Sequence, residues 1–183
     1  SSKELKKVVG DSVGSKWGKK AKKEPLLECN LQFFADKNGC EPTGATYEGS
    51  IYRSVDSRYN PLEMSQYTIN SNHRYTESGV PGLYFSSGEK IVKAELGNYD
   101  VFDFSNRTMY QYDVRLTNML DVSNPSVRSQ LNISLESIIG ESYDVTHAIG
   151  RYAYSNGYNG IIAPSARADG GINIILFNAK GVK

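Results

Sequence analysis

The chain has 183 residues and a mass of 20.3 kDa, a length that suits one domain with a hydrophobic core of its own. Hydrophobic residues make up 39% and charged residues 22% of the sequence, which excludes a fibrous protein and a wholly disordered one. No apolar run approaches the ~20 residues that cross a bilayer, and the N-terminus has no signal-peptide pattern. We therefore expect a globular domain with no membrane partner and no export signal of its own.

The formal net charge of +1 conceals two segments of opposite charge. Residues 1–23 contain eight Lys and two acidic residues, whereas the remaining residues contain thirteen Lys and Arg and eighteen acidic residues. Lysines interleaved with glycine over 14–23 are too polar to pack against a core, so we predict a flexible basic linker over 1–25 and one domain over 26–183. A tether to nucleic acid or to a membrane surface is the alternative for the linker. The acidic domain argues against nucleic acid as a partner.

The two cysteines, Cys29 and Cys40, lie in the early part of the chain. They form no Cys-x-x-Cys pair and have no histidine beside them, so we expect no metal site. A single disulfide between them stays open, although reduced thiols are the default in a cytosolic setting.

Three segments organise the first half of the predicted domain. The pattern over 45–53 indicates a strand, and the short apolar run at 83–85 indicates another. The sequence Ser-Ser-Gly-Glu at 86–89 fits a capping box, in which a serine oxygen and a glutamate side chain satisfy free amides of a helix's first turn. We therefore expect a helix through 91–96, capped at Ser86.

The second half predicts further strands and another helix. Segments 99–104 and 110–116 alternate between apolar and polar residues, as half-buried strands do, and we expect them to pair. Apolar spacing after Asp144 predicts a helix that this residue caps. Short apolar strands follow at 160–163 and 172–177, the second apolar on both faces and therefore central in a sheet. The irregular interleaving predicts an α+β fold, one compact domain with a mixed, mainly antiparallel β core and short flanking helices.

Glu95 is the first residue that points to chemistry. It lies four residues after Ile91 and three after Val92, along the helix face that should pack on the core. A buried carboxylate without a partner is costly. Glu95 therefore either pairs with an arginine inside the fold or faces a cleft, where an oriented carboxylate can stabilise a developing positive charge.

Two arginines with aromatic neighbours form the second feature, in the pairs Tyr52-Arg53 and Arg74-Tyr75. A guanidinium group binds carboxylate or phosphate oxygens two at a time, and an aromatic face holds a planar ring or a cation. Together they suit a dinucleotide, and surface salt bridges are the alternative. The sequence has no glycine-rich turn of the Rossmann or P-loop type that would bind the phosphates instead.

Ser165 is the third feature, just after the apolar strand at 160–163 and Pro164. The Gly-x-Ser-x-Gly pattern of a nucleophile is absent, and neither His73 nor His147 is spaced as its general base. Ser165 is therefore expected to act as a hydrogen-bonding ligand, or else to satisfy the backbone of its own turn.

The order and context of these segments resemble the RES family over about Tyr52 to Phe177. The resemblance rests on five pieces in the family's order: Tyr-Arg at the first strand end, an Arg-aromatic pair before a Gly, Leu-Tyr-Phe-Ser leading into a helix with Ala-Glu, Gly-Ile-Ile-Ala-Pro-Ser-Ala-Arg, and Asn-Ile-Ile-Leu-Phe. The second piece reads His-Arg-Tyr here, where Arg-Phe is commoner in the family.

The resemblance implies a toxin domain that degrades NAD, with a fold similar to that of ADP-ribosyltransferases. Arg53 and Arg74 would hold the NAD phosphates or orient the nearby ribose, and Tyr84 would line the nicotinamide pocket. Glu95 would be the catalytic carboxylate, and Ser165 would position the nicotinamide ribose; Arg53 and Ser165 would share in catalysis with Glu95. NAD is then the substrate, and no cofactor or metal is implied.

A toxin of this kind implies a delivery route and a partner. Residues 30–35, Asn-Leu-Gln-Phe-Phe-Ala, resemble the junction before C-terminal toxin domains of Gram-positive polymorphic toxins, including those with an LXG delivery domain. The chain would then be secreted as part of a longer toxin and act in the cytoplasm of a target cell, or else be cytoplasmic. A cognate immunity protein or antitoxin would cover the cleft. An ADP-ribosyltransferase acting on a protein, and a noncatalytic nucleotide-binding module, are the alternative functions.

Overall fold

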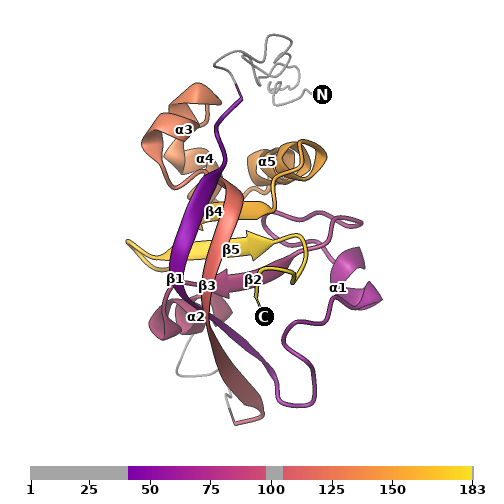
Figure 1. Cartoon of the computed structure of the whole chain (residues 1–183). Helices are drawn as coiled ribbons and strands as arrows, with labels where there is room; N and C mark the ends of the chain where they lie inside the picture. Colours follow the sequence, from indigo (N-terminus) through magenta and orange to yellow (C-terminus); the bar gives the residue numbers. More distant parts are fainter. Residues whose placement is uncertain (1–40, 98–104, 183) are drawn as a thin grey trace.

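The computed structural model describes residues 41–97 and 105–182. Both cysteines, the predicted linker, the junction at 30–35 and the predicted strand at 99–104 with its pairing lie outside the described residues. The elements, shown in Figure 1, are β1 (Ala45–Asp56), α1 (Gln66–Asn70), β2 (Leu83–Ser86), α2 (Glu89–Leu96), β3 (Arg107–Asp121), α3 (Pro125–Gln130), α4 (Leu135–Ile139), α5 (Asp144–Ser155), β4 (Gly160–Pro164) and β5 (Ile172–Leu176).

The strands of the described residues close into a barrel in the order β1-β2-β5-β4-β3. All neighbouring strands are antiparallel except β3 and β4, which are parallel. The long ribbon of β1 and β3 crosses the shorter strands (Figure 1), and β2 joins β1 through Ser86 and Tyr52. The α+β class with a mixed, mainly antiparallel core is therefore confirmed. Strand β5, predicted to be central, pairs on both edges, with β2 and β4, as every strand of a closed barrel does.

The hydrophobic core lies on both faces of β4 and β5. Ile161 and Ile175 belong to one buried cluster, and Ile162 and Ile174 belong to the other. Successive side chains of a strand point to opposite faces, so each of these strands contributes to both clusters. Strands buried on both faces read as continuous apolar runs, which is why the sequence showed them clearly.

Helix α5 packs closely against the segment that precedes β2. A Cβ atom at Gly150 would lie only 1.8 Å from the carbonyl oxygen of Tyr75, so only glycine lets the helix approach so near. The His147 imidazole also contacts the carbonyl oxygen of His73, with Nε2 2.8 Å away. The helix thereby holds the segment around Tyr75 against the barrel.

Two predicted helix caps differ from the structure. Helix α2 begins at Glu89 with Gly88 as its N-cap and no side-chain cap, because Ser86 is still part of β2 and its hydroxyl donates to Asn173. The capping box at 86–89 was therefore wrong. Helix α5 has Tyr143 as its N-cap, and Asp144 is its first helical residue.

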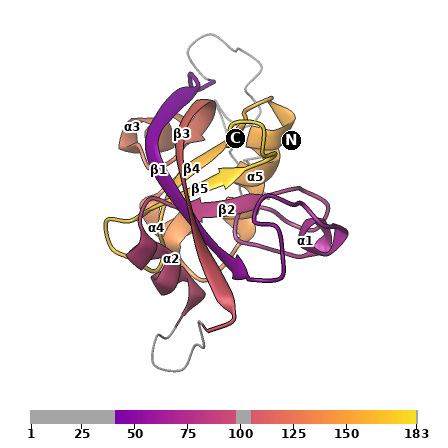
Figure 2. The same ribbon diagram turned by 60° about the horizontal axis from the view of Figure 1, so that its bottom comes forward.

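Helices α1 and α2 lie toward opposite ends of β2 in both views of the ribbon (Figures 1 and 2). Helix α2 packs on β1 and β2, and its buried Val92 anchors it there. In the described ranges, no helix combines the length and the apolar character needed to span a membrane.

Candidate active site

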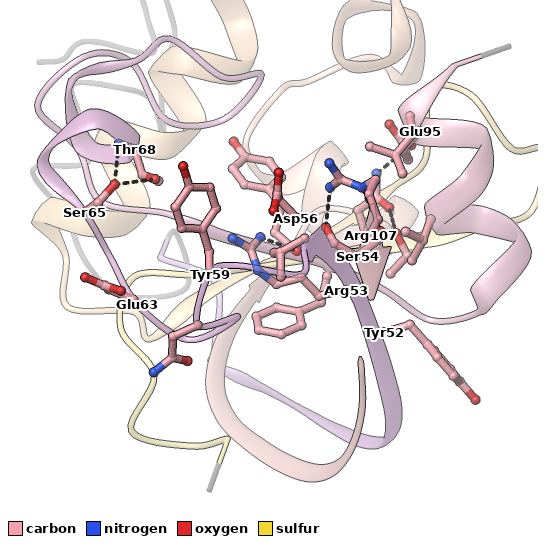
Figure 3. A pocket seen from close by; sticks show the side chains of 18 of the residues that line it. Tyr52, Arg53, Ser54, Asp56, Tyr59, Glu63, Ser65, Thr68, Glu95 and Arg107 are labelled. Carbon is pink, nitrogen blue, oxygen red and sulfur yellow. Dashed lines mark hydrogen bonds between the residues drawn. The ribbon is translucent and has the colours of Figure 1, made fainter. Parts of the chain in front are cut away.

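A cleft of about 680 Å³ lies along the end of β1, between α1 and α2. Its walls include charged, aromatic and amide side chains from several segments: Arg53, Tyr59, Tyr84, Glu95, Arg107 and Asn173. Figure 3 shows the side chains of the α1 end, with Tyr59, on one side and Glu95 with Arg107 on the other. Among the described residues, no group of three His, Cys, Asp or Glu side chains could hold a metal ion.

Glu95 lies in the last turn of α2 and is half-buried at one end of the cleft. Its Oε2 accepts a hydrogen bond from the Ser165 hydroxyl and a second from Asn173 Nδ2, at 2.8 Å. No ion pair to Glu95 occurs in the part of the chain that the structure describes. Of the two alternatives for this carboxylate, the arginine pair is therefore not formed, and the carboxylate lines the cleft.

Ser165 satisfies its own turn and contacts Glu95 at the same time. Its side chain is buried, and its Oγ accepts the backbone N–H groups of Arg167 at 3.1 Å and Ala168 at 2.9 Å. The hydroxyl hydrogen is then directed to Glu95. Ser165 thus satisfies the backbone of its own turn, and its hydroxyl also bonds a side chain that lines the cleft.

Asn173 and Ser86 are site residues that the sequence analysis missed. The Ser86 hydroxyl donates to Asn173 Oδ1 at 2.8 Å, and both side chains line the cleft. The available signal was a polar residue within an otherwise apolar strand, in Ile-Asn-Ile-Ile-Leu and Leu-Tyr-Phe-Ser. Such a residue needs a partner when it is buried.

Arg53 is held at the cleft wall by two carbonyl groups. Its Nε donates to Pro61 O at 2.8 Å and its Nη1 to Tyr84 O at 3.0 Å, and its guanidinium lies 5.8 Å from the centre of the Phe85 ring. Burial lowers the pKa of Arg53, and the positive charge of Arg107 lowers it further. An arginine keeps its charge despite such a shift.

Arg107, the first residue of β3, is a second cation of the cleft that the sequence analysis did not select. Its Nε donates to Ser54 Oγ at 2.9 Å and its Nη2 to Ser54 O at 2.7 Å. Because Arg107 and Arg53 repel each other electrostatically, an anion between them would be favoured by both. No local pattern in the sequence marks Arg107.

The Tyr84 ring projects from β2 and lines the cleft, whereas its hydroxyl is held by residues that do not line the cleft. The Tyr84 hydroxyl accepts the backbone N–H of Tyr75 at 2.8 Å and lies 3.1 Å from Thr76 Oγ1. Burial raises the pKa of Tyr84 to about 12, so the ring is a neutral wall at physiological pH. The ring centre lies 5.6 Å from that of His73.

Arg74 lies apart from the other predicted site residues. Its Nη1 donates to the carbonyl oxygens of Ile138 at 3.2 Å and Gly140 at 2.6 Å, and its guanidinium lies 4.9 Å from the centre of the Tyr143 ring. It is not among the residues that line the cleft. The structure thus brings Arg53, Tyr84, Glu95 and Ser165 to one region and places Arg74 against the segment between α4 and α5.

Exposed tyrosines line the end of the cleft farther from Glu95. Tyr59 is 60% exposed and Tyr67, on α1, is 84% exposed. The Arg58 guanidinium lies 5.3 Å from the centre of the Tyr59 ring and is itself bound by both carboxylate oxygens of Asp56. The Tyr67 ring and the part of the Tyr59 ring that Arg58 leaves uncovered are accessible to a planar ligand.

The fold and the site together define an α+β domain with a small barrel and a half-buried, hydrogen-bonded carboxylate at the end of a cleft that holds two arginines. The family model of the RES domain matches residues 44–183, so the chain belongs to the RES domain family. The resemblance of the sequence to the RES family is thereby confirmed.

One solved structure shows how far the fold is shared. A chain of the M. tuberculosis MbcT-MbcA toxin-antitoxin complex superimposes with a TM-score of 0.58 at 14% identity, over 73% of this chain and 76% of that chain. At this identity the likeness concerns the fold. No curated protein matched the sequence.

Proposed function

We propose that the chain is a toxin domain that degrades NAD by cleaving the bond between nicotinamide and ribose, as a glycohydrolase or a phosphorylase. The observation that carries this proposal is the Glu95 carboxylate, held by Ser165 and Asn173 at one end of a cleft with two arginines. Membership of the RES domain family supports it, as does the fold shared with a toxin-antitoxin structure.

The cleft contains the group on which this bond cleavage depends most, a carboxylate held in place. Nicotinamide in NAD carries a positive charge, so it leaves with the electron pair of the C–N bond and needs no strong acid. The ribose becomes oxocarbenium-like, and the fixed negative charge of Glu95 stabilises it. Water or phosphate then adds to the sugar carbon and releases a proton.

The remaining residues suit the rest of the dinucleotide. Arg53, with Arg107 beside it, would hold the diphosphate, and Tyr84 would line the nicotinamide pocket next to Glu95. Ser165 would position the nicotinamide ribose indirectly, by holding the Glu95 carboxylate that faces it. Arg74 would orient a phosphate or ribose only after its guanidinium releases the carbonyl of Gly140.

A protein that destroys a central metabolite requires an inhibitor in the cell that makes it. We propose a cognate immunity protein or antitoxin that covers the cleft and places a carboxylate near Arg53. The solved relative comes from a complex with an antitoxin, which supports a partner of this kind. Secretion within a longer, LXG-type toxin and action in the cytoplasm of a target cell complete the proposal.

The test is product analysis after incubation of the protein with NAD, with and without phosphate. The proposal expects nicotinamide with ADP-ribose, or with phosphorylated ADP-ribose when phosphate is the acceptor. Transfer of labelled ADP-ribose to protein would instead establish the transferase. Intact NAD after long incubation with micromolar protein would leave a noncatalytic binding module and contradict the proposal.

A further inference from the structure

We propose that Asn173, oriented by Ser86, is a positioning residue that presents one chosen oxygen of Glu95, Oε1, to the reacting ribose. This inference rests on the proposed function and adds two residues to its machinery. It is carried by a hydrogen-bond chain that joins β2, β5, α2 and the turn at Ser165.

The strand register brings the first two members of the chain together. Ser86 at the end of β2 and Asn173 in β5 are direct partners across an antiparallel pair. Opposite residues of such a pair project to the same face with their Cβ atoms about 5 Å apart, which is hydrogen-bond reach for these side chains. Ser86 is only 4% exposed, so water competes little for its hydroxyl.

The chemistry of the groups determines the direction of every hydrogen bond in the chain. An ionised carboxylate only accepts, so the Asn173 side chain must turn its NH₂ group toward Glu95 and its oxygen toward Ser86. The Ser86 hydroxyl must then donate to that oxygen. Without this donor, rotation of the amide would place an oxygen against the carboxylate, and the two would repel.

Ser165 donates to the same carboxylate oxygen as Asn173. Its Oγ already accepts two backbone N–H groups, so its single hydrogen is available for Glu95 alone. Oε2 thus receives two donors. Within residues 41–97 and 105–182, no hydrogen bond to Oε1 is recorded.

The consequence is a carboxylate with two unlike oxygens. Oε2 fastens the group to the barrel, and Oε1 retains its lone pairs for the positive charge that develops on the ribose. Because the ground-state dinucleotide gains little from this orientation, its loss should lower kcat and leave KM nearly unchanged.

The experiment measures initial rates of nicotinamide release from NAD for Asn173→Ala and Asn173→Asp. The second variant keeps the size of the side chain and removes the donor. We expect kcat to fall about 10- to 100-fold in both, with KM and the Kd of ADP-ribose within about threefold of wild type, as for a misplaced catalytic group. Asn156→Ala, which removes an exposed amide at the end of α5, is the matched control and should keep full kcat.

Substitution of Ser86 tests the orientation separately. Ser86→Ala should lower kcat about three- to tenfold, because the Asn173 amide then loses the partner that fixes its position, whereas Ser86→Thr retains the hydroxyl and should restore most of the rate. A purely structural role for Ser86 would not separate these two variants by kcat at equal melting temperature.

Three other outcomes of these measurements would contradict the inference. Full kcat in Asn173→Ala, with an active wild type, overturns it and leaves the proposed function intact. A loss found only in variants whose melting temperature collapses assigns Asn173 to the fold and overturns it as well. A wild-type chain that does not consume NAD removes the proposed function, and the inference with it, before any variant is compared.

Discussion

The two ends of the cleft are built in opposite ways. At the Glu95 end the polar side chains are buried and hydrogen-bonded: Ser165 is 8% exposed and donates directly to the Glu95 carboxylate, and Ser86 is 4% exposed and acts on it through Asn173. At the α1 end the rings of Tyr59 and Tyr67 are mostly exposed. A rigid, partly desolvated end suits chemistry, in which geometry must not relax, and an open aromatic end suits binding of a ring that arrives and leaves. The comparison predicts that substitutions at the first end change kcat and those at the second change KM.

The largest effect is expected for Glu95→Gln. The substitution keeps the shape of the side chain and removes the negative charge, so nicotinamide release should fall at least about 10³-fold while ADP-ribose still binds. Glu89→Gln is the matched control on the same helix: Glu89 makes an exposed pair with Lys93 at 3.9 Å, and the variant should turn over NAD like wild type. Turnover by Glu95→Gln near the wild-type rate would remove Glu95 from the mechanism.

Arg53→Ala should rank second and affect both parameters. Arg53 lies between the two ends and is tied to Pro61 and Tyr84 by hydrogen bonds. Its loss removes a diphosphate contact and loosens the cleft wall, so KM should rise about tenfold and kcat should fall by a similar factor. Arg115→Ala, which breaks an exposed pair with Glu48 at 3.8 Å, serves as the control in the same rate and binding assays.

The sequence predicted the parts of this molecule whose signal is local. The strand at 45–53, the central strand at 172–177 and the helix through 91–96 all appear, because apolar periodicity reports burial directly. The closure of the barrel and the parallel pairing of β3 with β4 depend on contacts between distant segments, which periodicity does not encode. The helix cap at Ser86 was wrong because tertiary pairing with β5 extended β2 over that serine.

The site residues divide in the same way, into those with a local sequence signal and those without one. Glu95 and Ser165 could be selected from their local context, yet the hydrogen bond that joins them spans seventy positions of the chain. Asn173 and Arg107 were missed because their importance comes from partners on neighbouring elements that are distant in the sequence. Arg74 carries an equally suggestive local pattern, but its guanidinium binds the carbonyls at the end of α4.

Tyr59→Ala tests the open end of the cleft and should have a smaller effect. If the adenine ring stacks on Tyr59, removal of the ring should raise KM for NAD about three- to tenfold with kcat unchanged. Tyr59→Phe keeps the aromatic face and should behave like wild type. With nicotinamide mononucleotide, which has no adenine, Tyr59→Ala and wild type should show the same kcat/KM; an equal loss with both substrates would place the adenine elsewhere.

The smallest effect concerns pH at the same end. Hydrogen bonds from Arg58, at 3.0 and 2.9 Å to the two carboxylate oxygens, lower the pKa of Asp56 to about 2, against an ordinary value of about 3.9. A lowered pKa in the folded state means that the pair stabilises the protein above the ordinary value and that this contribution is lost as the pH falls toward 2. The guanidinium that lies on the Tyr59 ring would lose its anchor over the same pH interval.

Because Arg58 is largely exposed, the gain in stability should be slight, and NMR titration of the Asp56 carboxyl is the sensitive measurement. Its midpoint should lie near 2 in wild type and move toward 3.9 in Arg58→Ala, whereas a midpoint that ignores Arg58 would mean that the ring at the open end is not anchored through this pair.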